Sequence, residues 1–309
     1  MFRGVDHIGI GVGDMERALA FYGAVGFSDV LFDYKGPTPG SEAFTGGAPR
    51  HAHIVMLASA EATPMGPARV KLVQVLDGDA PPPVPAGLGW GELGICEICL
   101  HVRNLDEVHA RLAALPGGGT LMAPLSGAVP PHDVTLDISY VHDPWGGKIE
   151  MIEWTGLWKQ LPGPARAEGV NHVAFGVTDM QASLAFYRRL GFDEFFFEST
   201  EFFGPMAPWY DRELPGQHMV MMLSAQGGGI EPTQLTPLGP DCRGEWGHLG
   251  PMEFAVGVAN LERACEVLRG EGVELLGEPQ TVDVGAGEWR SVAIREPDGL
   301  FVSLVEARY

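Results

Sequence analysis

The sequence predicts an α+β fold built from four βαβββ modules, and three observations lead to this prediction. The stretch 4–27 returns at 169–192 with thirteen of its 24 positions identical. Weaker copies of the same unit begin near Gly94 and at Gly250. Each copy is followed by alternating apolar segments that are typical of strands. Strands therefore outnumber helices too strongly for the crossovers of a doubly wound parallel sheet.

The repeated unit reads as a strand, a helix and the start of another strand. In the first copy an apolar strand over roughly 4–11 precedes Asp14, a residue type that favours helix N-termini. Apolar residues then recur at helical spacing up to Gly26, and a glycine commonly follows the last turn of a helix. The same reasoning predicts three more helices, over 104–115, 179–190 and 260–270.

Connecting segments suggest how the modules group along the chain. At 309 residues the chain suits two domains of about 150 residues each. We expect a first domain at 1–155, a linker at 156–168 and a second domain at 169–309. Within the first domain, the Pro-rich segment 77–92 separates two modules, and the Gly/Pro-rich stretch 35–50 is predicted to be an irregular loop.

Composition narrows the class of function. Forty acidic residues against twenty basic ones give a net charge of −20, which argues against binding to nucleic acid or to anionic membrane surfaces. No apolar run is long enough to span a bilayer, and we expect no signal peptide before the first predicted strand. Four cysteines do not make a disulfide framework in a chain of this length, so we expect a cytoplasmic protein.

Paired modules with HxxxxVxDxxxxxxFY openings and DPxGxxIE endings resemble the vicinal oxygen chelate superfamily. This superfamily includes glyoxalase I, methylmalonyl-CoA epimerase, extradiol ring-cleaving dioxygenases, and the bleomycin and fosfomycin resistance proteins. The resemblance covers essentially the whole chain and implies two tandem glyoxalase-like domains. In such domains the first and last strands of each module lend ligands to one divalent metal ion inside a cupped sheet.

Carried over to this sequence, the resemblance implies a complete ligand set in the first domain, namely His7, Gln74, Glu97 and Glu150. Nitrogen and oxygen ligands with two carboxylates suit a divalent ion such as Ni, Co, Zn, Mn or Fe(II). Glu150 and Glu97 are also the candidate catalytic bases. Lys71 remains an alternative to Gln74, because a three-residue slip of the alignment places Lys71 at that position.

The second domain offers a poorer set at the equivalent positions, namely His172, Gln234, Glu253 and Ser303. Because serine stands where the fourth ligand is expected, only one carboxylate remains, and we expect this domain to be metal-free or to bind metal poorly. Aromatic and methionine residues are dense between 195 and 222, which suits an apolar pocket or an interdomain surface.

The resemblance implies a lyase or isomerase of glyoxalase or epimerase type. Such an enzyme chelates two adjacent substrate oxygens and transfers a proton through an enediolate-like intermediate. Two alternatives remain, an extradiol ring-cleaving dioxygenase and a non-enzymatic small-molecule binding protein of the antibiotic-binding type. Few basic residues lie near the proposed ligands, so the expected partner is an uncharged, apolar or aromatic small molecule. Modules pair within a chain or across a homodimer in the superfamily, and both arrangements remain open.

Overall fold

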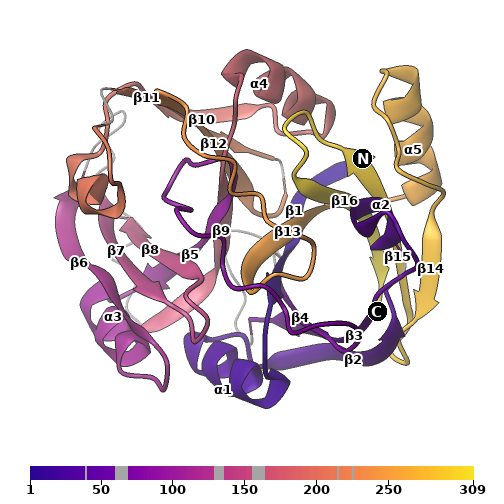
Figure 1. Cartoon of the computed structure of the whole chain (residues 1–309), viewed down its shortest axis with the longest axis horizontal. Coiled ribbons are helices and arrows are strands. Elements are labelled where there is room, and N and C mark those ends of the chain that lie inside the picture. The colour runs from indigo at the N-terminus through magenta and orange to yellow at the C-terminus, as the bar shows by residue number, and fades with distance from the viewer. Residues whose placement is uncertain (39, 60–68, 129–135, 155–163, 214–215, 225) are drawn as a thin grey trace.

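The computed structural model describes residues 1–38, 40–59, 69–128, 136–154, 164–213, 216–224 and 226–309. In this part of the chain, the order of strand, helix and three strands occurs four times (Figure 1). The predicted α+β class and the four βαβββ modules are therefore confirmed.

The first two modules differ mainly in one short extra helix. Module one consists of β1 (Phe2–Gly11), α1 (Met15–Val25), β2 (Asp29–Pro37), α2 (Glu42–Thr45), β3 (His51–Ala58) and β4 (Arg69–Val75). Module two consists of β5 (Gly94–Arg103), α3 (Leu105–Ala113), β6 (Gly119–Ala128), β7 (Leu136–His142) and β8 (Lys148–Trp154). Within the stretch predicted to be an irregular loop, β2 continues to Pro37 and α2 forms a single helical turn.

The last two modules repeat the same order. Module three consists of β9 (Arg166–Gly176), α4 (Met180–Arg189), β10 (Glu194–Ser199), the 3₁₀ helix η1 (Gly204–Trp209), β11 (Gly216–Leu223) and β12 (Gly229–Thr236). Module four consists of β13 (Gly250–Val258), α5 (Leu261–Gly270), β14 (Gln280–Asp283), β15 (Glu288–Arg295) and β16 (Phe301–Arg308). None of the helices in the described ranges is long and apolar enough to cross a membrane.

The modules combine into two eight-stranded sheets. Modules one and four form the first sheet, in the order β14-β15-β16-β13-β1-β4-β3-β2, which we call the terminal sheet. Modules two and three form the second, in the order β10-β11-β12-β9-β5-β8-β7-β6, which we call the central sheet. Figure 1 shows the indigo start and yellow end of the chain together in the terminal sheet, beside the magenta and orange central sheet.

The first strand of each module lies where two modules meet. It runs parallel to the last strand of its own module, as β1 does to β4 and β5 to β8. On its other side it runs antiparallel to the first strand of the partner module, so β1 pairs with β13 and β5 with β9. Side chains on the first and last strands of two different modules are thereby brought to the middle of each sheet.

The predicted division at 156–168 does not separate the two sheets. Residues 1–155 supply β1 to β4 to the terminal sheet and β5 to β8 to the central sheet. The end of the predicted linker belongs to β9, which starts at Arg166, while residues 155–163 lie outside the described part of the chain. The repeats in the sequence show where each module begins. They do not show which two modules pair, because the backbone groups at the edge of one first strand can hydrogen-bond to any other first strand.

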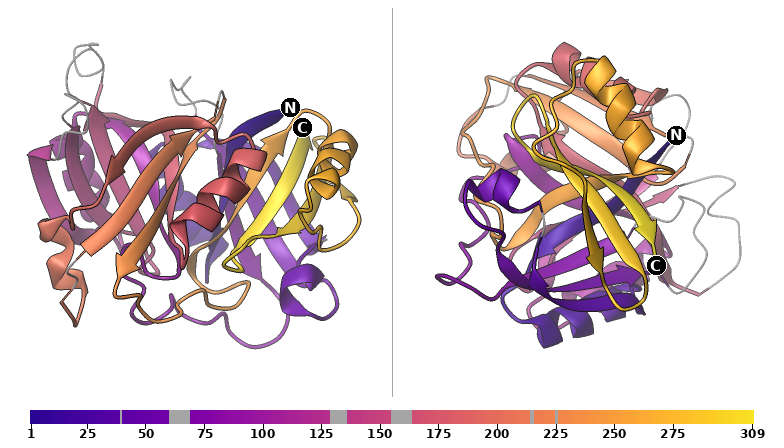
Figure 2. Two further views of the ribbon diagram at one scale, coloured as in Figure 1. Left: turned by 90° about the horizontal axis from the view of Figure 1, so that it is seen from above. Right: turned by 90° about the vertical axis from the view of Figure 1, so that its right-hand side faces the viewer.

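One hydrophobic core joins the two sheets, which lie side by side in the view from above (Figure 2). It contains residues of the long helices and of the first strands of all four modules. The rings of Phe175 from the central sheet and Phe254 from the terminal sheet stack with centroids 5.6 Å apart. A smaller cluster of buried apolar residues lies within each sheet. The inner face of each sheet therefore has its own core, separate from the joint one.

Candidate metal centre

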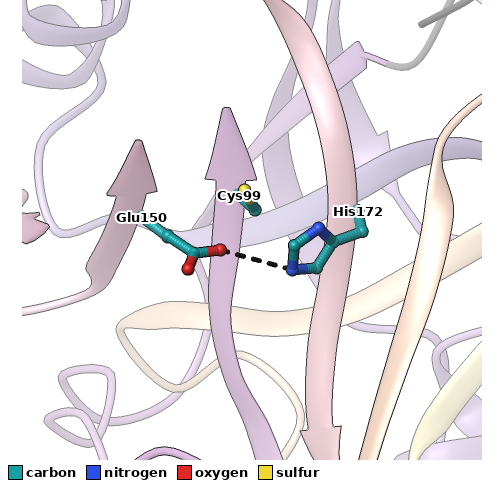
Figure 3. A group of neighbouring side chains, drawn as sticks. All are labelled: Cys99, Glu150 and His172. Atoms are coloured by element: carbon teal, nitrogen blue, oxygen red, sulfur yellow. Dashed lines mark ion pairs between the residues drawn. The ribbon is translucent and has the colours of Figure 1, made fainter. Parts of the chain in front are cut away.

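Three side chains form a row across neighbouring strands of the central sheet (Figure 3). Cys99 on β5 is opposite Glu150 on the parallel strand β8 and opposite His172 on the antiparallel strand β9. All three residues are buried. Their ligand atoms lie within 4.8 Å of one another, so one metal ion could contact all three.

Two further carboxylates complete the cluster. Glu97 precedes Cys99 by two residues on β5 and therefore shares its face of the sheet. Glu231 comes from β12, the parallel neighbour of β9. Ligand atoms of Glu97, His172 and Glu231 also lie within 4.8 Å of one another. The Nε2 atom of His172 is 3.3 Å from Oε2 of Glu150 and 3.6 Å from Oε2 of Glu231, which places the imidazole at the centre.

Several ligand atoms in this cluster have no hydrogen bond of good geometry. They are Oε2 of Glu97, Oε2 of Glu150 and Nε2 of His172. The other nitrogen of this imidazole, Nδ1, lies 2.8 Å from Oδ1 of Asn171, which leaves Nε2 facing the carboxylates. Nε2 of His172 and Oε2 of Glu150 share only a long contact of 3.3 Å, and a bound cation would satisfy all three atoms.

The hydroxyl of Tyr140 holds two of the carboxyl groups. Its oxygen is 2.7 Å from Oε1 of Glu150 and 3.2 Å from Oε1 of Glu97. One hydroxyl has only one proton to donate, so without a cation the second carboxyl must carry a proton of its own. Burial, together with the charges of Glu150 and Glu231, raises the pKa of Glu97 well above its usual range, which assigns that proton to Glu97.

The pKa values of Glu231, Glu150 and His172 are shifted by burial and by one another. Burial raises the pKa of Glu231 to about 7, and the charge of Glu150 adds to this rise. Burial also acts to raise the pKa of Glu150, but the hydrogen bond and charge of His172 outweigh it and lower the pKa. Burial opposes the charged form of His172, yet Glu231 and Glu150 raise its pKa. The cluster holds more carboxylate than it can ionise alone, which is the property expected of a divalent cation site.

The donor set itself fits such an ion. Three carboxylates and one imidazole are hard or intermediate ligands, preferred by divalent ions such as Mn, Fe(II), Co, Ni and Zn. Burial raises the pKa of the Cys99 thiol well above its usual range, and the charge of Glu150 adds to the effect. Without a cation the sulfur is therefore a neutral neighbour of the carboxylates, and a bound ion would be needed to stabilise its thiolate form.

The cluster forms the polar floor of a cavity of about 180 Å³. Glu150, His172 and Glu231 line this cavity. Its other walls are mainly aromatic, aliphatic and methionine side chains from β7, β8, β10, β11 and the segment around η1. The apolar pocket expected from the aromatic and methionine residues is thus part of the same site as the candidate metal ligands.

Comparison with known proteins agrees with this architecture. The Glyoxalase/Bleomycin resistance protein/Dioxygenase superfamily matches residues 4–151 and 169–304. The chain belongs to this superfamily. No match is found among curated protein sequences.

Two solved structures have the same fold over nearly the whole chain. Glyoxalase I from Zea mays is 17% identical, with a TM-score of 0.62, and the match covers 98% of this chain and 92% of that one. A putative dioxygenase from Bacillus subtilis subsp. subtilis str. 168 is 13% identical, with a TM-score of 0.61, and the match covers 100% of this chain and 86% of that one. At these identities the likeness concerns the fold.

The structure does not bring the four predicted ligands together. Glu97 and Glu150 lie in the central sheet, whereas His7 and Gln74 lie in the terminal sheet. Because modules two and three share a sheet, the imidazole that joins Glu97 and Glu150 is that of His172. In the cluster around Glu97 and Glu150, His172 from the second half of the chain therefore takes the place expected for His7.

Neither predicted glutamine reaches a cluster. The Nε2 of Gln74 donates to the carbonyl oxygen of Gly13 at 3.1 Å, and Oε1 of Gln234 accepts from the backbone N–H of Met180 at 3.0 Å. The residues facing inward lie three positions earlier, at Lys71 and Glu231, and an offset of three reverses the face of a strand. The sequence analysis did not predict Glu231. The alternative alignment that replaces Gln74 by Lys71, three residues earlier, would replace Gln234 by Glu231 in the equivalent strand.

The terminal sheet repeats the geometry with different residues. Ser303, Ala255 and His7 are in register across β16, β13 and β1, just as Glu150, Cys99 and His172 are in the central sheet. The remaining two positions hold Glu253 and Lys71. The poorer site that we expected in the second domain is therefore made by modules one and four.

Lys71 occupies the interior of this second cluster. Its ammonium group forms an ion pair with Oε1 of Glu253 and lies 4.9 Å from the ring centre of Trp289. The other carboxylate oxygen of Glu253 accepts from Nε1 of Trp246 at 2.7 Å. The adjoining cavity measures only about 20 Å³. A lysine cation thus neutralises the one carboxylate of this cluster, and the residues do not fit a divalent ion.

Proposed function

We propose that this protein is a divalent-metal-dependent lyase or isomerase of glyoxalase or epimerase type. Its substrate carries two adjacent oxygens, and the reaction moves a proton on the carbon next to a carbonyl group. The observation that carries the proposal is the convergence of three buried carboxyls and one imidazole on the floor of an apolar cavity.

In this proposal Glu97, Glu150 and His172 hold the ion. Tyr140 fixes the two carboxyls through its hydroxyl, and Asn171 orients the imidazole so that Nε2 points to the cluster. When bound, the ion acts as a Lewis acid for the substrate oxygens. The sequence suggested that Glu150 and Glu97 both bind the metal and act as catalytic bases. This proposal keeps only their role in binding the metal.

Glu231 is the proton carrier in this proposal. It lines the cavity, whereas Glu97 does not. Unlike Glu150, it does not bond to the Tyr140 hydroxyl, which contacts Glu97 and Glu150. A carboxylate next to the bound substrate can accept the proton from carbon and return it to the neighbouring carbon or oxygen. The apolar walls keep water from competing for that proton.

The first experiment measures the metal content of freshly purified protein and two matched variants. We expect about one divalent ion per chain, because only the central sheet has the ligand charge to bind it. His172→Gln should lose the ion, and His7→Gln, the equivalent substitution in the terminal sheet, should retain it. Loss of metal from His7→Gln with retention in His172→Gln would contradict the assignment.

The second experiment measures proton transfer directly. Metal-loaded protein is incubated in D₂O with hydroxyacetone or 2-hydroxyacetophenone, and proton NMR follows exchange of the hydrogens on the hydroxymethyl carbon. Glu231→Gln should keep the metal and lose at least about a hundredfold in exchange rate, the loss typical of a missing general base. Ser303→Ala, at the position equivalent to Glu150, should leave the rate unchanged. Full exchange by Glu231→Gln would remove it as the proton carrier.

The ring-sized aromatic cavity also favours a second candidate, an extradiol ring-cleaving dioxygenase. Such an enzyme uses two imidazoles and one carboxylate on Fe(II), whereas this cluster has one imidazole and three carboxyls. Oxygen uptake by iron-loaded protein with catechol tests this alternative. Uptake that is lost in His172→Gln would favour the dioxygenase over proton transfer.

A further inference from the structure

We infer that the substrate of the central-sheet site is an uncharged compound with a single aromatic ring and two adjacent oxygens on a short side chain. The inference names the substrate class of the proposed reaction and in that respect rests on the proposed function. The evidence for it comes mainly from the cavity walls, together with the cluster residues that form the floor.

The charges around the cavity exclude anionic substrates. Among the described residues that line it there is no lysine or arginine, while Glu150, Glu231 and the exposed Glu201 carry carboxyl groups. A carboxylate or phosphate at the far end of a ligand would meet acidic, apolar or uncharged polar side chains there. Conjugates of acidic peptides or nucleotides therefore do not match this site, because no lysine or arginine among the described lining residues can bind them.

The walls are suited to an aromatic ring. Trp90, Trp154 and Phe197 provide flat ring surfaces, and Met219 and Met221 add flexible thioethers. Aromatic side chains favour offset or edge contacts with another ring, and methionine sulfur makes favourable contacts with ring edges. A purely aliphatic chain of the same length would gain less from these surfaces.

The size of the cavity suits a ligand with one ring. Its volume of about 180 Å³ slightly exceeds the roughly 150 Å³ of an engineered apolar cavity that binds benzene. One ring with a two-carbon side chain fits this space. The side-chain oxygens then point to the polar floor, where His172, Glu150 and Glu231 line the cavity.

The segment around η1 closes the cavity on one side. Phe202, Phe203 and Met206 belong to this segment and line the cavity. The ring of Trp209 packs edge-on against Tyr140, with centroids 4.8 Å apart, so the segment also contacts the residue that holds the metal-site carboxyls. An aromatic ligand would be enclosed between this segment and the sheet.

The test compares three ligands that share the hydroxyketone group. Isothermal titration calorimetry with zinc-loaded protein measures the affinity of 2-hydroxyacetophenone, of hydroxyacetone, which lacks the ring, and of 4-(hydroxyacetyl)benzoate, which adds an anionic group. We expect 2-hydroxyacetophenone to bind at least about tenfold more tightly than either of the others. Equal or tighter binding of hydroxyacetone or of the benzoate would overturn the inference.

Substitutions in the cavity walls test whether the aromatic ligand binds in the cavity of the central sheet. Phe202→Ala should weaken binding of 2-hydroxyacetophenone about five- to tenfold, and Phe44→Ala, a phenylalanine beside the small cavity of the terminal sheet, should not change it. Met219→Lys should improve binding of the benzoate relative to the neutral ligand, because it adds the missing cation. Equal effects of the two alanine variants would overturn the inference.

Failure of this inference is distinct from failure of the proposed reaction. Selective binding of 2-hydroxyacetophenone without proton exchange would support the aromatic site and remove the proposed chemistry. Exchange of hydroxyacetone and 2-hydroxyacetophenone with equal affinity and rate would support the chemistry and overturn the substrate class.

Discussion

Lys71 and Glu231 occupy equivalent positions in the two sheets, and the difference between them gives each cluster its charge. At Lys71 an ammonium ion neutralises Glu253 inside the protein. At Glu231 a third carboxyl joins Glu97 and Glu150. A single residue at the same position of a last strand thus decides whether the cluster contains a cationic side chain or a further carboxyl group.

The ion pair of Lys71 and Glu253 should behave as a coupled unit in unfolding. Lys71→Met or Glu253→Gln alone should lower the free energy of unfolding by about 3–5 kcal/mol, because each leaves a buried charge without its partner. The double variant should cost much less than the sum, since it removes both charges. Urea denaturation of the four proteins measures this difference. Additive losses would show that the pair is not coupled.

His7 should make stability depend on pH near neutrality. Burial lowers its pKa, and the nearby charge of Lys71 lowers it further, while Asp6 acts in the opposite direction. Below about pH 6.5 the unfolded chain binds a proton at this residue before the folded chain does. The stability supplied by the neutral imidazole is therefore present above that pH and is lost as the pH falls.

Comparison with His7→Gln isolates this contribution from those of other histidines. Between pH 7 and 5 the wild-type protein should lose free energy of unfolding more steeply than His7→Gln, by at most about 1.4 kcal/mol per pH unit. Urea denaturation at several pH values measures both slopes. A steeper slope in the variant would contradict the assigned direction.

Helix starts were largely predictable from the sequence. Asp14, Asp179 and Asn260 accept hydrogen bonds from backbone N–H groups three residues later, as expected of N-cap residues. Asn104 differs, because its φ of 60° directs the side chain elsewhere. There the carboxyl of Glu153 on β8 accepts from the backbone N–H groups of Asn104 and Leu105, at 3.0 and 2.9 Å. A cap supplied by a distant strand has no local sequence signal.

Glu153 should therefore matter more for α3 than Asn104 does. Glu153→Ala should lower the free energy of unfolding by about 1–3 kcal/mol, because two backbone donors lose a charged acceptor. Asn104→Gly should change it by less than about 1 kcal/mol, since glycine adopts positive φ readily. Thermal and urea unfolding of both variants test the order. A larger loss in Asn104→Gly would contradict the role given to Glu153.

At the scale of the whole molecule, two tyrosines connect one sheet with the other. The hydroxyl of Tyr22 on α1 donates to Oδ2 of Asp143 in the turn before β8, at 2.9 Å. The hydroxyl of Tyr187 on α4 is 3.3 Å from Oε1 of Glu296, in the turn before β16. Each bond links a module of one sheet to a module of the other, in addition to the shared core.

The sheet order predicts which fragments of the chain can fold. The fragment 88–240 contains all eight strands of the central sheet, whereas 1–154 contains half of each sheet. We expect 88–240 to unfold cooperatively and to bind a divalent ion, because its strands have their partners. Fragment 1–154 should neither unfold cooperatively nor bind the ion, since β1 and β5 lose their antiparallel partners β13 and β9. Circular dichroism melts and metal titration of both fragments measure this, and cooperative melting of 1–154 alone would contradict it.

The sequence by itself determined the class of fold and the four modules. Period-two alternation placed Glu97 and Cys99 on one face, and the repeat identified His172 and Glu253 as equivalents of His7 and Glu97. These features follow from local patterning, which each segment carries in its own residues. They were sufficient to indicate the superfamily.

Only the tertiary structure decided which modules share a sheet and which residue of each last strand faces inward. The edge of a first strand offers the same backbone donors and acceptors to any other first strand, so pairing depends on packing across the whole core. Gln74 and Lys71 both lie in the same apolar run, and a slip of three residues exchanges the two faces. For these reasons the sequence indicated the first strands that carry Glu97 and His172, and the fold determined that these residues meet Glu150 and Glu231.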